Sequence, residues 1–272
     1  MFDFITGSFN PEKTNEYILS IQISLGGFSF SIFSSRENKI VAFKHAPLKI
    51  SSDILILRHF NEWIKNEEVL QKKYLRTVLV YYSSEFSLIP ETLFNSQLVK
   101  EATTRLIDAN EQKQVEIGTI KELGTPAKVV FYLPKNLKEM IAQNFPLAKL
   151  IHPVQLIIEQ SPQGNKNNKV VLLYYKKSFI VVASRGKQIL LANSFNIEHI
   201  NDLVYFLLNA LVQLNLNLKE TDLFILEALT RIEELEELLR PYFPEISYLS
   251  PSNSIGNVEM VPVSIHRYFS FV

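Results

Sequence analysis

The 272-residue sequence contains no cysteine. Disulfide bonds, thiolate metal sites and cysteine nucleophiles are therefore excluded. The sequence also lacks the HExxH metal motif, the GxSxG nucleophile elbow and the GxxxxGK[ST] phosphate loop. It has few histidines, and none of them forms a pair at metal-binding spacing: His45, His59, His152, His199 and His266. We therefore expect no metal site and no catalytic residues of these kinds.

An excess of charge of either sign is also missing, because Lys+Arg and Asp+Glu each number 28. No global charge attracts the chain to nucleic acid or to anionic lipid, which leaves only a local patch as an alternative, and we expect no nucleic-acid partner. Long apolar runs are absent too. The longest apolar helix candidate, Leu203 to Leu214, is interrupted by Asn209 and Gln213 and is too short to span a bilayer. The N-terminus does not resemble a signal peptide. These features predict a soluble, cytoplasmic protein without an integral membrane segment.

The apolar content is high, at 47%, which is enough for one large globular domain or two smaller ones. Apolar and polar residues nearly alternate over residues 16–24 and 28–33, and this period predicts strands. A third apolar run at residues 39–43, a helix that opens near Asp53 and a strand at residues 77–82 complete the first half.

The second half repeats this order of elements. We expect three strands, a helix that opens at Asp202, another strand and an amphipathic helix, over residues 170–175, 178–183, 188–192, 202–211, 222–226 and 232–239. A constant offset of 149 residues aligns the halves without a gap and places Asp53 on Asp202. The repeated order predicts an internal duplication. Two unrelated segments of similar pattern are the alternative. Since residues 161–169 are polar and rich in turn formers, we expect one lobe over residues 1–160 and a second over 161–272.

The motifs SIQISLGGFSFSIFSS and VFYLPKNLKEMIAQNFPLAKLIHPVQLIIE, together with the second group of strands, resemble the actin, sugar-kinase and chaperone ATPase superfamily. The ordered set is similar to pilus-assembly and cell-division actin homologues. It is most similar to an uncharacterised bacterial family with an actin-like ATPase fold. The resemblance implies an α/β fold of two ribonuclease-H-like lobes with a nucleotide cleft between them. It spans most of residues 16–239.

In that superfamily, the first phosphate loop reads Asp-x-Gly-Gly-Thr, with the aspartate helping to position magnesium. In this chain, Ser24 stands at the aspartate position, Gly26 and Gly27 remain, and Phe28 replaces the threonine. Ser29 still offers a hydroxyl. The resemblance therefore implies a retained turn that has lost its metal-linked carboxylate.

The second and third loops depart from the superfamily pattern as well. Lys176 and Lys177 lie at the second loop, where both glycines are missing, although two lysines can still attract phosphate. The third loop, at residues 227–230, also lacks its glycines. Because phosphoryl transfer depends on positioning and on charge neutralisation by Mg²⁺, these losses predict that the chain binds no nucleotide cofactor. The alternative is ATP with magnesium, held by rearranged loops.

Two pairs of adjacent tyrosines stand at the ends of predicted strands, Tyr81-Tyr82 and Tyr174-Tyr175. Ligand clefts of open α/β sheets lie at such ends, so these rings either fill the former cleft or are ordinary core and rim residues. A nuclease would need carboxylates on the first strands, but Ser24 and Leu173 occupy those positions.

Three hypotheses about function follow. The first is a catalytically degenerate actin-like protein that binds a protein partner. The second is an active ATPase or small-molecule kinase with rearranged loops. The third is a scaffold that polymerises or joins a membrane-associated complex. The sequence identifies neither the partner nor the oligomeric state.

Overall fold

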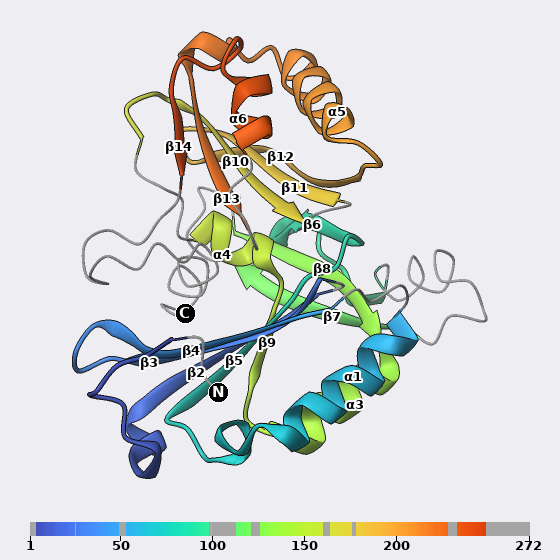
Figure 1. The fold of residues 1–272 in the computed structure, drawn as a ribbon. Coiled ribbons are helices and arrows are strands. Elements are labelled where there is room, and N and C mark those ends of the chain that lie inside the picture. The colour runs from blue at the N-terminus through green and yellow to red at the C-terminus, as the bar shows by residue number, and fades with distance from the viewer. Residues whose placement is uncertain are drawn as a thin grey trace.

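The structure of the chain is a computed structural model. It describes residues 4–24, 26–48, 53–97, 99, 113–120, 126–159, 164–175, 178–227 and 233–248. These residues form a mixed α/β fold with three sheets, as Figure 1 shows.

The first sheet has the strand order β1-β4-β3-β2-β5-β9. Its strands β2, β3 and β4 are antiparallel neighbours, whereas β5 runs parallel to β2 and β9 runs parallel to β5. The strands are β1 (Phe4–Ile5), β2 (Tyr17–Ser24), β3 (Gly27–Ser34), β4 (Lys39–Pro47), β5 (Arg76–Tyr81) and β9 (Lys149–Ile151).

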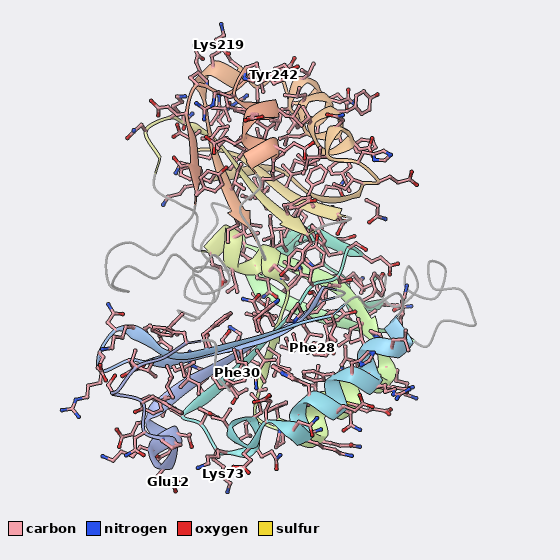
Figure 2. All side chains as sticks on the ribbon, viewed as in Figure 1. Glu12, Phe28, Phe30, Lys73, Lys219 and Tyr242 are labelled. Atoms are coloured by element: carbon pink, nitrogen blue, oxygen red, sulfur yellow. The ribbon has the colours of Figure 1, made fainter. Side chains whose placement is uncertain are left out.

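Helices α1 (Asp53–Asn66) and α3 (Lys135–Asn144) cover one face of this sheet (Figure 1). Phe28 and Phe30 of β3 lie between the sheet and α1 (Figure 2). The Phe28 ring lies 5.2 Å from that of Phe60 and 5.4 Å from that of Trp63. This aromatic cluster explains the alternation along β3, since every second residue of the strand points into it.

The second sheet has the order β12-β11-β10-β13-β14. Its strands are β10 (Asn168–Tyr175), β11 (Ser178–Arg185), β12 (Gln188–Asn196), β13 (Thr221–Glu227) and β14 (Ile246–Tyr248). Both faces are buried, so β10 is a continuous apolar run rather than an alternating one. Val170 and Leu172 belong to the cluster that contains residues of α5 (Ile200–Gln213) and α6 (Glu233–Leu239). Val171 and Leu173 belong to the cluster that contains α4 (Pro153–Glu159).

A third, three-stranded antiparallel sheet of order β6-β8-β7 lies between the other two in Figure 1. It consists of β6 (Phe86–Pro90), β7 (Lys113–Ile120) and β8 (Ala127–Pro134). The sequence pattern predicts only β8. Short 3-10 helices complete the described elements, at Pro11–Glu16, Glu68–Gln71, Glu91–Leu93 and Leu218–Glu220.

The two large sheets share the same order of elements, but the constant offset of 149 residues is wrong for their first two strands. The hairpin pair Ser24 and Gly27 corresponds to Tyr175 and Ser178, an offset of 151 (175 − 24). The ends of β4 and β12, Pro47 and Asn196, keep the offset of 149. The correction moves each strand by two residues, which leaves every side chain on its expected face. The pairing of the strands, rather than residue identities, therefore gives the correct alignment of the second hairpin with the first.

We expect Leu207→Ala to lower the free energy of unfolding by about 2–5 kcal/mol, because the side chain is fully buried beneath the second sheet and its loss leaves a cavity. Val212→Ala, on the same helix but 63% exposed, should change it by less than about 0.5 kcal/mol. Urea denaturation monitored by circular dichroism measures both. Equal effects of the two substitutions would contradict the placement of α5.

Candidate functional site

The side chain of Ser24 forms hydrogen bonds within the turn of the β2–β3 hairpin. The Ser24 hydroxyl donates to the Gly27 carbonyl over 3.2 Å and accepts the Gly26 N–H over 3.1 Å. The Gly26 carbonyl accepts the N–H of Leu48 over 3.0 Å. A serine side chain that bonds to its own turn is a common way to satisfy backbone groups locally. Ser24 thus supplies no carboxylate, and its hydroxyl is engaged within the hairpin.

Gly27 is required by the packing of β3 against β4. Its φ of +124° is a conformation that L-residues with a side chain rarely adopt. A Cβ at this position would lie 2.2 Å from the Ala46 carbonyl oxygen and 2.7 Å from the Leu48 nitrogen. The fold alone therefore accounts for this glycine, without a bound phosphate.

Ser29 does not lie at the tip of the hairpin. It is buried in β3, opposite Gln22 on one side and His45 on the other. It shares a polar face of the first sheet with Ser20 and Gln22, and this face is opposite to the aromatic cluster. Ser20 is completely buried, and Gln22 is 7% exposed. The structure therefore places Ser29 within the sheet, separated from Ser24 by the hairpin turn.

The second hairpin contains Tyr175 and Ser178, which pair across β10 and β11. Lys176 and Lys177, the predicted phosphate-attracting residues, lie outside the described residues, as do residues 228–230 of the third loop. Tyr175 occupies the position that Ser24 has in the first hairpin. An aromatic ring thus stands at this position in the second sheet.

The two sheets meet through a tyrosine pair at the carboxyl ends of their strands. Tyr82 follows β5, and its backbone N–H donates to the Ile23 carbonyl over 3.0 Å. Its ring lies 3.9 Å from the Tyr175 ring, with an angle of 46° between the planes. Its hydroxyl is 3.2 Å from that of Ser178. We call these three residues, Tyr82, Tyr175 and Ser178, the tyrosine junction.

Both phenols of the tyrosine junction remain neutral near physiological pH. Burial raises the pKa of Tyr82, an effect that the hydrogen bond to Ser178 partly offsets. Burial also raises the pKa of Tyr175, and the neighbouring Tyr82 raises it further. The junction is therefore an uncharged contact, in which ring packing and one hydroxyl pair connect the two sheets.

His152 forms several hydrogen bonds close to the tyrosine junction, at the N-terminus of α4. Its Nδ1 accepts the Val154 N–H over 3.2 Å, so the proton is on Nε2, which donates to the Ser83 carbonyl over 2.9 Å. The Gln155 side chain accepts the His152 N–H over 3.1 Å. These reciprocal bonds cap the N-terminus of α4 in the manner of a capping box. The bond from Nε2 connects this helix start to Ser83, the residue that follows Tyr82.

The His152 ring is completely buried, with the rings of Phe86 and Phe131 at 4.6 and 5.3 Å. Burial lowers the pKa of His152 from 6.5 to about 4, although the hydrogen bond to Ser83 acts in the opposite direction. The imidazole is therefore neutral at pH 7, and both of its nitrogens are already bonded. It is a structural residue, not a base that can reach a substrate.

The described residues do not fit a magnesium-bound nucleotide. No group of three or more His, Asp or Glu residues that could hold a metal ion occurs among them. At the first hairpin, the side-chain oxygen at the position of the superfamily's aspartate is bonded to the turn itself. At the second, the Tyr175 ring is in contact with the ring of Tyr82 from the first sheet. We therefore derive no phosphoryl-transfer step for this arrangement.

The structure brings together some of the predicted site residues and separates others. Ser24, Gly26 and Gly27 share one hairpin, Ser29 lies apart from them, and Tyr82 and Tyr175 are in ring contact. Sequence reasoning missed Ser178 and the role of His152. A signal for His152 was present, since proline follows it and glutamine stands three positions later, as at a capped helix start.

Comparison with solved structures shows an actin-like ATPase fold. A Bacteroides thetaiotaomicron protein with this fold and unknown function is 24% identical, with a TM-score of 0.78 over 92% of this chain and 96% of that one. The PilM–PilN type IV pilus biogenesis complex matches with a TM-score of 0.57 and 12% identity, over 93% and 95% of the chains. The cytoplasmic domain of EpsL from Vibrio cholerae, an inner membrane component of the type II secretion system, matches with a TM-score of 0.50 and 14% identity over the same shares.

Comparison with curated proteins gives no match. A family model described as "Protein of unknown function (DUF3822)" matches residues 6–246. Among the described helices, none combines the length and the apolar character needed to cross a bilayer.

We expect Gly27→Ala to destabilise the fold by at least about 2 kcal/mol, because the added Cβ would collide with the backbone of β4 at a strained φ. The matched control is Gly7→Ala, since a Cβ there has no neighbour within 4 Å. Thermal denaturation of both variants in nucleotide-free buffer tests this expectation. A Gly27→Ala protein as stable as the Gly7→Ala protein would contradict the structural role of Gly27.

We expect His152 to make stability depend on pH. An unfolded chain takes up a proton on this residue below pH 6.5, whereas the folded chain does so only near pH 4. Its contribution is therefore complete above pH 6.5 and is lost as the pH falls toward 4, by about 3 kcal/mol in total. His152→Asn retains a capping acceptor but does not titrate, so the difference in stability between the two proteins should shrink over this interval. Urea denaturation at pH 7.5 and 4.5 measures it, with His59→Asn as the control at a half-buried position. Parallel pH profiles for wild type and His152→Asn would show that the buried imidazole is not responsible.

Proposed function

Given that this chain belongs to the DUF3822 family of proteins of unknown function, we propose that it is a catalytically degenerate actin-like protein that works by binding a protein partner. The observation that carries the proposal is the tyrosine junction. In the superfamily that the sequence resembles, nucleotide lies between two lobes. In this chain, Tyr82 and Tyr175 are in ring contact between the two sheets.

The fold supports a duplicated origin within this proposal. The order of three antiparallel strands, helix and parallel strand occurs in both large sheets. We infer two ribonuclease-H-like lobes from this repetition, with the division near residues 160 and 161. The three-stranded sheet is then an insertion into the first lobe, because its strands lie between β5 and α3 in the sequence.

The energetics of the junction favour a closed, nucleotide-free state. An aromatic pair contributes about 0.5–1.5 kcal/mol beyond the burial of its area. A nucleotide in this position would have to separate the rings and break the hydroxyl pair of Tyr82 and Ser178. It would gain no carboxylate-held magnesium at Ser24 in return, and magnesium supplies much of the charge neutralisation in phosphoryl transfer. We propose that the chain uses no nucleotide cofactor.

The type of partner is suggested by the solved structures. PilM and PilN form a complex of proteins, and the EpsL domain is the cytoplasmic part of a membrane component. At 12% and 14% identity these similarities show the fold alone, so a protein partner for this chain is a proposal. A cytoplasmic location is part of the same proposal. The balance of 28 basic and 28 acidic residues gives no reason to invoke nucleic acid.

Isothermal titration calorimetry with Mg-ATP tests the nucleotide-free role. We expect wild type to bind Mg-ATP with a dissociation constant weaker than about 1 mM. Ser24→Asp should behave in the same way, because a restored carboxylate does not remove the tyrosine contact. Low-micromolar binding by wild type, with magnesium-dependent release of phosphate, would overturn the proposal in favour of an active ATPase or kinase.

A further inference from the structure

The corresponding outer edges of the two large sheets differ in whether a further strand covers them. In the first sheet, the edge of β4 is covered by β1, where Phe4 pairs with Phe43 and Ile5 pairs with Ala42. In the second sheet, β12 holds the equivalent place, and among the described strands it pairs with β11 alone. An uncovered edge presents unpaired N–H and C=O groups, which proteins usually hide or use for strand addition. The equivalent edge is therefore covered in the first sheet and, as far as the described strands extend, uncovered in the second.

A groove of about 810 Å³ follows this open edge. Five consecutive residues of β12, from Gln188 to Ala192, form one wall, and Leu88 and Pro90 of β6 contribute to the other. β6 is itself the edge strand of the three-stranded sheet, and Figure 1 shows it below the second sheet. The Ser194 hydroxyl donates to the Ser84 carbonyl, which joins the two walls at one end. The groove thus lies between two sheet edges.

The chemistry of the groove suits an extended peptide. Its walls contain Ile189, Leu190 and Leu191, which are partly buried, and its exposed end contains Arg185 and Lys187. No carboxylate occurs among the described residues that line it. The Arg185 Nε donates to the side-chain oxygen of Asn168, which is an uncharged partner. The groove therefore combines an open ladder of backbone groups, an apolar floor and a cationic end.

We propose that this groove binds an extended segment of a partner protein by strand addition to β12. The segment is apolar and carries carboxylates at its C-terminal end. An antiparallel orientation, the commoner one in sheets, directs that end toward Arg185 and Lys187. Main-chain hydrogen bonds provide affinity in this mode, and side-chain pockets provide specificity. Because five residues of β12 line the groove, the bound core is about five residues or 17 Å long.

This inference deepens the proposed partner-binding role and rests on it. It differs in location from the tyrosine junction, since none of the three residues of the junction lines the groove. Failure of the proposed nucleotide-free role therefore does not imply failure of the proposed peptide groove, and the reverse also holds. If Mg-ATP binds but the groove also accepts a peptide, only the nucleotide-free role fails. If Mg-ATP does not bind and the groove rejects the peptide, only the docking site fails.

The probe is a synthetic acetylated peptide of alternating valine and threonine that ends in two aspartates and a free carboxylate, added to the full-length protein. We expect amide chemical-shift changes in two-dimensional NMR spectra to be confined to β12, β6 and their turns. A second peptide, N-methylated at alternate residues, lacks the N–H groups that a ladder needs and should not bind. Binding of the methylated peptide with equal affinity would overturn strand addition.

Charge reversal tests the orientation. Arg185→Glu combined with Lys187→Glu should lower the affinity for the acidic peptide by about fivefold, as expected for the loss of two exposed ion pairs. The matched control is Lys73→Glu, an exposed lysine that Figure 2 places at the far end of the first sheet. It should leave affinity unchanged. An equal effect of both variants, no binding up to millimolar peptide, or shifts of the β12 amides with protein concentration alone would each overturn the proposal. The last outcome would show that a second copy of this chain occupies the edge.

Discussion

The burial of α4 between the sheets is the constraint on which the rest of the structure depends. Six of the seven residues of this helix are buried, and the helix contacts both β7 and β11. Gly118 of β7 makes room for it, since a Cβ there would lie 2.2 Å from the Gln155 side chain. His152 fixes its N-terminus to Ser83. A short apolar helix thus fills the space between the three-stranded sheet and the second sheet, and it determines how closely they approach.

The tyrosine junction and the groove both follow from this approach. With α4 in place, the carboxyl ends of β5 and β10 face each other, and the rings of Tyr82 and Tyr175 meet. The same arrangement brings β6 beside β12, and the groove lies between these two edges.

Most strands of the two large sheets could be predicted from period and turn residues, because their patterns reflect which faces are buried. The three-stranded sheet could not be predicted in full. β6 is five residues long and ends in Pro90, and β7 is only partly buried along most of its length, so neither shows a strong alternation. Both become strands by pairing with β8. The offset of 149 residues was wrong for β2 and β3 because identities of single residues are weaker than hairpin geometry as a guide to register.

The sequence by itself determined that the first hairpin keeps its glycines and lacks an aspartate, since this is a matter of residue identity. It also restricted the tyrosine pairs to two roles. Only the tertiary structure decided that Tyr82 and Tyr175 are in contact, because they are 93 positions apart (175 − 82) and meet through the packing of separate sheets. Likewise, only the structure showed that Gly27 lies against the backbone of Ala46, because close approach between strands is set by distances that no local pattern records.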